Sequence, residues 1–145
     1  MSLKEFLDRG QIKTHKTSKQ EIENLFKIVE RDLTDARSGV SPDWRFGIAY
    51  NAALKLCNIL LHAEGYRTGH GSHHIYAISV IPTILGNDKK DDADYLDSCR
   101  KKRNIVEYDC VGGATEEDAE ELIEFVIEFR DSVIKWLKKK HPEFI

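Results

Sequence analysis

Residues 42–64, which read PDWRFGIAYNAALKLCNILLHAE, predict a long helix that is apolar around most of its circumference. Its polar positions fall on one narrow stripe: Asn51, Lys55, Asn58 and His62. We expect Lys55, Asn58 and His62 to face solvent or to border a functional cleft. Ser41 before Pro42 is a typical helix start, and Gly65 is suited to the turn that ends it. Because a helix with so little polar surface must be surrounded by others, we expect it at the centre of a bundle.

Further helix signals flank this central segment on both sides. Apolar residues at helical spacing, with capping residues at the ends, predict helices over these ranges: 18–39, 72–82, 92–108 and 115–142, after a short lead-in near residues 3–10. Ser18 and Glu21 have the spacing of a capping box. Short linkers favour antiparallel neighbours. The sequence therefore predicts an all-α fold: an up-and-down antiparallel helical bundle of four main helices plus a shorter one.

The composition is that of an ordinary globular protein. The chain has 145 residues, of which 41% are hydrophobic and 32% charged, and we expect one domain over residues 1–145 with a core at about 20–140. No apolar run reaches the length of a membrane helix, and the first residues do not resemble a signal peptide. We therefore expect a cytoplasmic protein with no membrane partner.

The net charge of −3 argues against a protein that coats nucleic acid through a large basic surface. Any contact with nucleic acid therefore has to be local. Basic residues gather at 100–103, in the fourth main segment.

The three cysteines, Cys57, Cys99 and Cys110, are odd in number and lack the short spacings of a disulfide framework or zinc site. We expect them to be small buried side chains.

One residue breaks the apolar pattern of the segment at 92–108. Its apolar stripe should contain Leu96, Cys99, residue 103 and Val106, but residue 103 is an arginine. A buried guanidinium is costly unless it is paired or faces a wet cleft. Arg103 can therefore pair with Glu107 one turn later or with an acid on the neighbouring last helix. Alternatively, it can point into a groove that receives an anion such as a phosphate.

The run Arg103-Asn104-Ile105-Val106-Glu107-Tyr108 resembles the signature of the HEPN family (higher eukaryotes and prokaryotes nucleotide-binding). That signature is an arginine, commonly followed by a polar residue, with a histidine five to seven positions on. Residues 49–54 resemble the alanine- and aromatic-containing helix of the family, and residues 94–104 resemble an actinobacterial-type subgroup. The resemblance covers roughly residues 20–140.

The resemblance implies a homodimeric helical bundle in which the signature helices of two subunits form one cleft. Many family members are metal-independent endoribonucleases, often toxins with an antitoxin partner, and others bind RNA, nucleotides or proteins. Carried over to this chain, it gives Arg103 the arginine role and Asn104 the accompanying polar role. Tyr108 stands where the histidine is expected. Tyrosine is a poor base near neutral pH, so the anion site can persist while catalysis is weak or absent.

Two other parts of the sequence contain residues typical of binding or catalytic sites. His70, His73 and His74 form a cluster before the shorter helix, and one of them can lie near the cleft and act as the missing base. We expect them to hold no metal, since no acid lies near them in the sequence. The glycine-rich loop around Gly69 lacks the Gly-Lys-Ser/Thr of a phosphate-binding loop. No cofactor and no metal are expected.

These observations leave three functional classes open. The first is a dimeric RNA- or nucleotide-binding module with a degenerate nuclease-type site at Arg103, Asn104 and Tyr108. The second is an active metal-independent endoribonuclease of toxin or defence type, in which Tyr108 or a histidine from another helix supplies acid–base chemistry. The third is a structural partner subunit in which Arg103 is paired to Glu107.

Overall fold

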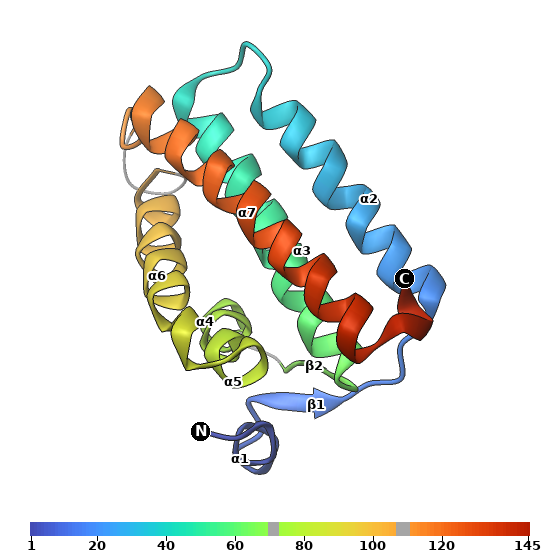
Figure 1. Cartoon of the computed structure of the whole chain (residues 1–145). Coiled ribbons are helices and arrows are strands. Elements are labelled where there is room, and N and C mark those ends of the chain that lie inside the picture. Colours follow the sequence, from blue (N-terminus) through green and yellow to red (C-terminus); the bar gives the residue numbers. More distant parts are fainter. Residues whose placement is uncertain (70–72, 107–110) are drawn as a thin grey trace.

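The computed structural model describes residues 1–69, 73–106 and 111–145 and confirms an all-α bundle (Figure 1). Its elements in chain order are α1 (Leu3–Asp8), β1 (Ile12–Thr14), α2 (Lys19–Ala36), α3 (Pro42–Ala63), β2 (Tyr66–Thr68), α4 (His73–Ser79), α5 (Ile81–Leu85), η1 (Asn87–Lys89), α6 (Lys90–Asn104), α7 (Glu116–Lys140) and η3 (Pro142–Phe144). The two short strands pair antiparallel, with Ile12 opposite Thr68.

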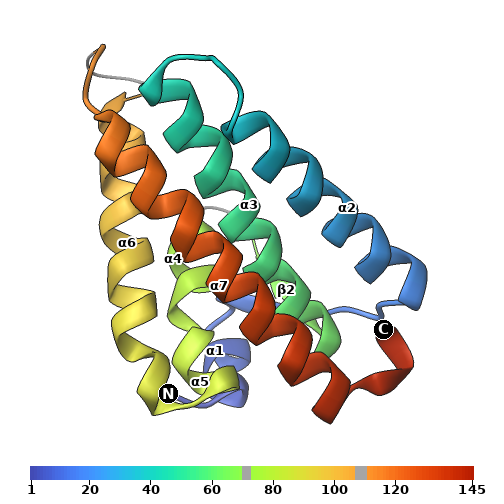
Figure 2. The ribbon, with the colours of Figure 1, turned by 45° about the horizontal axis from the view of Figure 1, so that its top comes forward.

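The four long helices alternate in direction, as an up-and-down bundle requires. Helices α2 and α6 run one way and α3 and α7 run the other. Both Figure 1 and Figure 2 show α3 between α2 and α7, with α6 and α4 on its remaining side. Helix α3 is therefore the central element, as its apolar sequence predicts.

The ends of α3 are set by the residues that the sequence singles out. The Ser41 hydroxyl accepts a hydrogen bond from the Trp44 N–H at 3.4 Å, and Pro42 occupies the first turn. Gly65 follows the C-cap with φ +92°, a conformation that favours glycine. The predicted boundaries of the central helix are thus confirmed to within one residue.

The polar stripe of α3 is half-buried, and His62, which we predict to face solvent, faces α2 instead. Asn51 donates a hydrogen bond to the buried Asp32 carboxylate of α2 at 2.7 Å. His62 lies 3.0 Å from Glu21, also on α2. Helix α2 packs over the stripe, and it can do so because it brings polar partners for these side chains.

Breaks in the remaining helices follow from local sequence. The shorter helix divides into α4 and α5 at Val80, immediately before Ile81-Pro82, because proline cannot continue an α-helical hydrogen-bond pattern. Helix α6 begins at Lys90 and is α-helical to Asn104, so the predicted segment at 92–108 extends beyond the residues described. Thr115 caps α7 and forms a capping box with Asp118.

Within residues 1–69, 73–106 and 111–145, no helix combines the length and hydrophobicity needed to cross a membrane.

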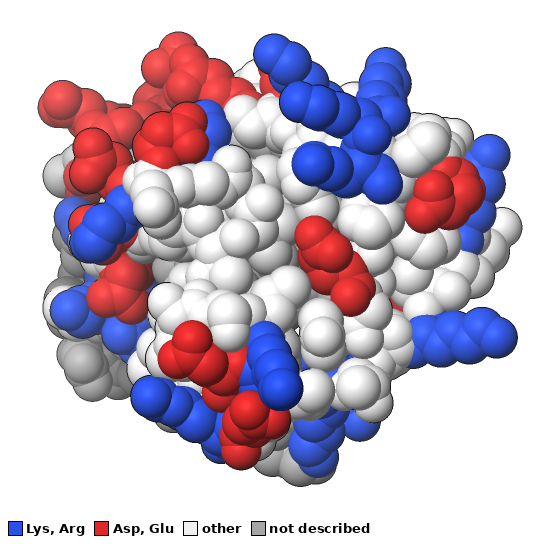
Figure 3. All heavy atoms as spheres, turned by 60° about the horizontal axis from the view of Figure 1, so that its bottom comes forward, with Lys and Arg blue, Asp and Glu red and all other residues white. Residues whose placement is uncertain are grey.

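Seen from the end where α1 and β1 lie, the molecule has a broad uncharged area with charged side chains of both signs mostly around it (Figure 3).

Candidate functional site

Arg103 lies near the C-terminal end of α6, at the end of the bundle where α3 begins. Its side chain is half-buried, and the guanidinium carbon is 5.8 Å from the centre of the Tyr50 ring. A cation over an aromatic face is attracted by the ring quadrupole. The arginine that interrupts the apolar stripe of α6 is therefore held against an aromatic residue of α3.

Tyr50 is buried under this cation, with only 1% of its surface exposed. Burial raises the pKa of its hydroxyl, and the nearby Cys57 raises it further, while Arg103 and Arg100 oppose the shift. The net pKa lies far above the ordinary value for tyrosine, so the phenol keeps its proton at neutral pH. Tyr50 therefore presents an O–H group rather than a phenolate.

A histidine from a third helix completes the cluster. His74 of α4 is half-buried, and its Nδ1 lies 3.4 Å from the Tyr50 hydroxyl. The two ring centres are 5.9 Å apart. A protonated phenol can donate to Nδ1 of a neutral imidazole and so favour one tautomer. Of the three histidines considered in the sequence, His74 is thus placed beside the tyrosine that Arg103 covers.

The structure describes only some of the other predicted site residues. Asn104 is half-buried at the last position of α6, next to Arg103. Tyr108 lies outside the described residues, and so does Glu107, the proposed partner of Arg103. Arg103, Tyr50 and His74 are therefore the cluster that the structure defines, and we name it the arginine–tyrosine–histidine cluster.

Acidic side chains balance the neighbouring basic residues of α6. Arg100 contacts Asp97 at 2.9 Å, and Lys101 contacts the same carboxylate at 3.5 Å. Lys102 reaches Asp118 of α7 at 2.8 Å and ties the two helices together. The basic run is therefore not one unbroken positive surface, which fits the net negative charge of the chain.

An apolar cleft of about 450 Å³ opens at the same end of the bundle. Trp44, Val106 and Val111 line it together with Ser41 and Asp43. Trp44 is 67% exposed although it is the largest apolar side chain of its helix. Exposed aromatic surface of this kind commonly marks an interface.

Arg45 is a buried charged residue of α3 that the sequence did not single out. It is buried, its Nε donates to the Ala36 carbonyl at 2.7 Å, and its guanidinium pairs with Glu116 and Glu120 of α7. These acids raise the pKa of Arg45, chiefly through the hydrogen bond to Glu120. The sequence feature that could have pointed to Arg45 is its charge, because most of the other residues of α3 are apolar. The contacts identify a structural residue that joins α2, α3 and α7.

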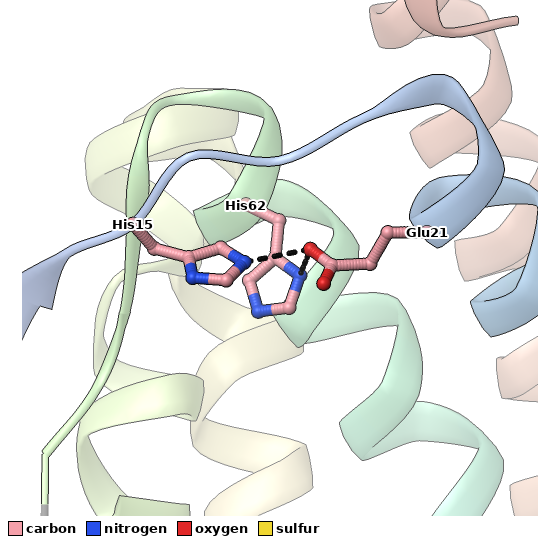
Figure 4. A group of neighbouring side chains, drawn as sticks. All are labelled: His15, Glu21 and His62. Carbon is pink, nitrogen blue, oxygen red and sulfur yellow. Dashed lines mark hydrogen bonds and ion pairs between the residues drawn. The ribbon is translucent and has the colours of Figure 1, made fainter.

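A second polar cluster lies at the opposite end of the bundle, where α2 begins and α3 ends (Figure 4). The Glu21 Oε1 atom is 2.7 Å from His15 Nε2 and 3.0 Å from His62 Nδ1. The sequence predicts a capping box formed by Ser18 and Glu21. The Ser18 hydroxyl does accept from the Glu21 N–H, but the Glu21 carboxylate is engaged by Thr17 and the two histidines.

The environment of this second cluster sets its ionisation. Burial raises the pKa of Glu21, but hydrogen bonds from His15 and Thr17 and the charge of His62 outweigh it, so the net pKa is lowered. Burial lowers the pKa of His62 despite the attraction of Glu21. At neutral pH the cluster therefore holds an ionised carboxylate next to a neutral imidazole, the forms in which both groups bind metals.

The chain was compared with protein-family models, curated proteins and solved structures, and none of the three comparisons finds a match.

Proposed function

We propose that the chain is a HEPN-like binding module that holds a phosphate group of RNA or of a nucleotide at Arg103. The observation that carries this proposal is the half-buried guanidinium held over the ring of the buried Tyr50. Asn104, beside it on the last turn of α6, supplies a further hydrogen-bonding group. Guanidinium groups suit phosphate oxygens because their planar N–H groups can donate two hydrogen bonds at once.

The location of Arg103 favours a role in phosphate binding over a role limited to stabilising the fold. The Tyr50 ring restricts the guanidinium, so less conformational entropy is lost when a phosphate binds. Tyr50 is itself fixed in the core, whereas Arg103 keeps part of its surface in solvent. This arrangement supports a local contact with an anion. A local contact is needed because the net charge of the chain, −3, does not attract anions by itself.

The proposal includes a homodimer in which a second copy covers the apolar cleft. The cleft lies at the same end of the bundle as Arg103, and the exposed Trp44 lines it. Covering this side chain would remove a large apolar area from water and bring two copies of the Arg103 region near one another. A phosphate-binding cleft could then be shared between the subunits.

We expect Trp44→Lys to convert the dimer to monomer, because it places a charge in the centre of the apolar contact. Sedimentation velocity measures the change directly. The matched control is Ile145→Lys, which charges another exposed apolar residue at the opposite end of the bundle. A parent protein that sediments as a monomer, or a Trp44→Lys dimer as strong as the parent, contradicts the proposed interface.

Binding of labelled single-stranded RNA and of a labelled nucleotide tests the anion site. We expect Arg103→Ala to weaken binding about 10-fold or more, since it removes a charge-assisted contact. The control Lys101→Ala removes a neighbouring, exposed cation of the same run and should change the affinity little. Equal losses in the two variants would indicate nonspecific attraction and count against a site at Arg103.

A second candidate function is a metal-independent endoribonuclease, and the position of His74 favours it. In such cleavage a base removes the 2′-OH proton, the 2′-oxygen attacks phosphorus, and an acid protonates the leaving 5′-oxygen. Histidine suits the proton-transfer steps, and His74 borders the same tyrosine as Arg103. Arg103 would stabilise the charge that develops on phosphorus-bound oxygen.

The same RNA, incubated with excess chelator, separates binding from cleavage. If the chain is a nuclease, we expect His74→Ala to abolish cleavage but leave most of the RNA affinity. Tyr50→Phe keeps the ring beneath Arg103 and removes only the hydroxyl, so it should retain binding and slow cleavage. Intact RNA with the parent protein favours the binding module, and absence of both binding and cleavage favours the third class, a structural partner subunit.

A further inference from the structure

The second polar cluster brings three potential metal ligands together from separate parts of the chain. His15 follows β1, Glu21 lies in the first turn of α2, and His62 lies in the last turn of α3. One ligand atom from each falls within 4.8 Å of the other two. We propose that His15, Glu21 and His62 form a binding site for a divalent transition-metal ion, with Zn²⁺ as the ion that fits the ligand set best.

The types of ligand select the class of metal. Two imidazoles and one carboxylate form a common zinc-binding set when a water or substrate completes the coordination. Imidazole nitrogen also suits Ni²⁺, Cu²⁺ and Fe²⁺, whereas Mg²⁺ and Ca²⁺ prefer oxygen ligands. The cluster offers two nitrogens and one carboxylate, so it favours zinc and its neighbours over the hard cations.

The distances are close to those that a bound ion requires. Zinc bonds of about 2.0–2.2 Å place the ligand atoms of a tetrahedral site roughly 3.3 Å apart. The Glu21 oxygen is already 2.7 Å from His15 Nε2 and 3.0 Å from His62 Nδ1. Relative to the roughly 3.3 Å spacing of zinc ligands, the Glu21 oxygen lies a few tenths of an ångström too close to each nitrogen.

His62 Nδ1 provides an independent indication of a ligand. This nitrogen is buried, and its 3.0 Å approach to Glu21 lacks the geometry of a hydrogen bond. A buried polar atom that makes no hydrogen bond is uncommon in native proteins. An ion shared with Glu21 and His15 would satisfy it.

The surroundings hold the ligands in place. Thr17 donates a hydrogen bond to Glu21 Oε1 at 2.7 Å, and the backbone N–H of His15 donates to the Gly65 carbonyl at 2.8 Å, which fixes the main chain that carries His15. Such supporting contacts orient metal ligands and strengthen binding. The positive charge of Arg67 acts on His62 and opposes a cation, which lowers the affinity without removing any ligand.

Occupation of the site would fasten the N-terminal segment to the bundle. The three ligands bridge the chain after β1, the start of α2 and the end of α3, so a bound ion links them in one cross-link. Metal that binds the folded chain more tightly than the unfolded chain raises thermal stability by mass action. A rise in the thermal midpoint with zinc is therefore a readout that depends on no enzymatic activity.

Isothermal titration of the chelator-treated chain with Zn²⁺, followed by thermal unfolding, tests the inference. We expect one equivalent to bind in the micromolar range or tighter and to raise the unfolding midpoint by several degrees. His15→Gln and His62→Gln should each weaken binding about 10-fold or more and remove the rise. Substituting Co²⁺ should give visible absorption bands of a low-symmetry site in the parent and not in these variants.

Two histidine controls separate this site from other nitrogen ligands of the chain. His141→Gln removes a histidine that contacts Glu64 and Glu143, and His74→Gln removes the one beside Tyr50. Both should bind zinc as the parent does. Loss of binding in His74→Gln with retention in His62→Gln would overturn the assignment, and so would a parent chain that binds no zinc at one equivalent.

Discussion

Replacing Arg45 by methionine is expected to lower the free energy of unfolding by about 2–3 kcal/mol, since buried hydrogen bonds of a charged group are lost. Methionine keeps most of the apolar stem but leaves the Ala36 carbonyl without its donor. It also removes the link to Glu116 and Glu120, which lie exposed on α7 and regain water. The loss should therefore be smaller than that of a fully buried ion pair.

The comparison variant is Arg103→Met, since Arg103 is the other arginine set among apolar residues. We expect it to lower stability by less than Arg45→Met does, because Arg103 keeps part of its surface in solvent whereas Arg45 is buried. Urea unfolding followed by circular dichroism measures both variants under the same conditions. A loss at Arg103 as large as that at Arg45 would assign Arg103 to stability and weaken the proposed anion site.

Truncating Ile59 to alanine is expected to destabilise the chain by about 3 kcal/mol, because a large-to-small change in a core leaves a cavity. Ile59 lies on α3 and is fully buried. Helix α3 packs against α2, α6 and α7, so neighbouring helices cannot close around one truncated residue without losing contacts elsewhere. Thermal or urea unfolding gives the value.

A graded series makes the Ile59 result interpretable. Ile59→Val removes a single methylene and should cost about 1 kcal/mol. Ile145→Ala makes the larger change at an exposed position near the C-terminus and should stay within about 0.5 kcal/mol of the parent. If Ile59→Ala were as mild as Ile145→Ala, α3 would not be the packed centre of the bundle.

Much of the secondary structure was predictable because its causes are local. Ser41 and Thr115 cap the helices that the sequence assigns to them, and Gly65 ends α3 with a positive φ. Pro82 lies at the predicted interruption of the shorter helix. Each of these signals acts within about one helical turn, so no knowledge of packing was needed to interpret it.

The candidate site was predictable only in part, for a related reason. Arg103 could be identified because it breaks the apolar periodicity of its own helix. Tyr50 and His74 belong to α3 and α4, and nothing in the sequence states that these helices meet beside Arg103. The family resemblance directed attention to Tyr108, which follows Arg103 in the chain, whereas the cluster that the structure defines recruits residues from other helices.

The sequence by itself determined the helical class of the chain, the centrality of α3, most helix ends and the one anomalous arginine of α6. Tertiary structure alone decided which polar residues meet. Asn51 and His62 face α2 rather than water, and the Glu21 carboxylate serves His15 and His62 rather than its own helix end. The physical reason is range: hydrophobic periodicity and capping depend on near neighbours, whereas polar clusters form where packing brings distant segments into contact.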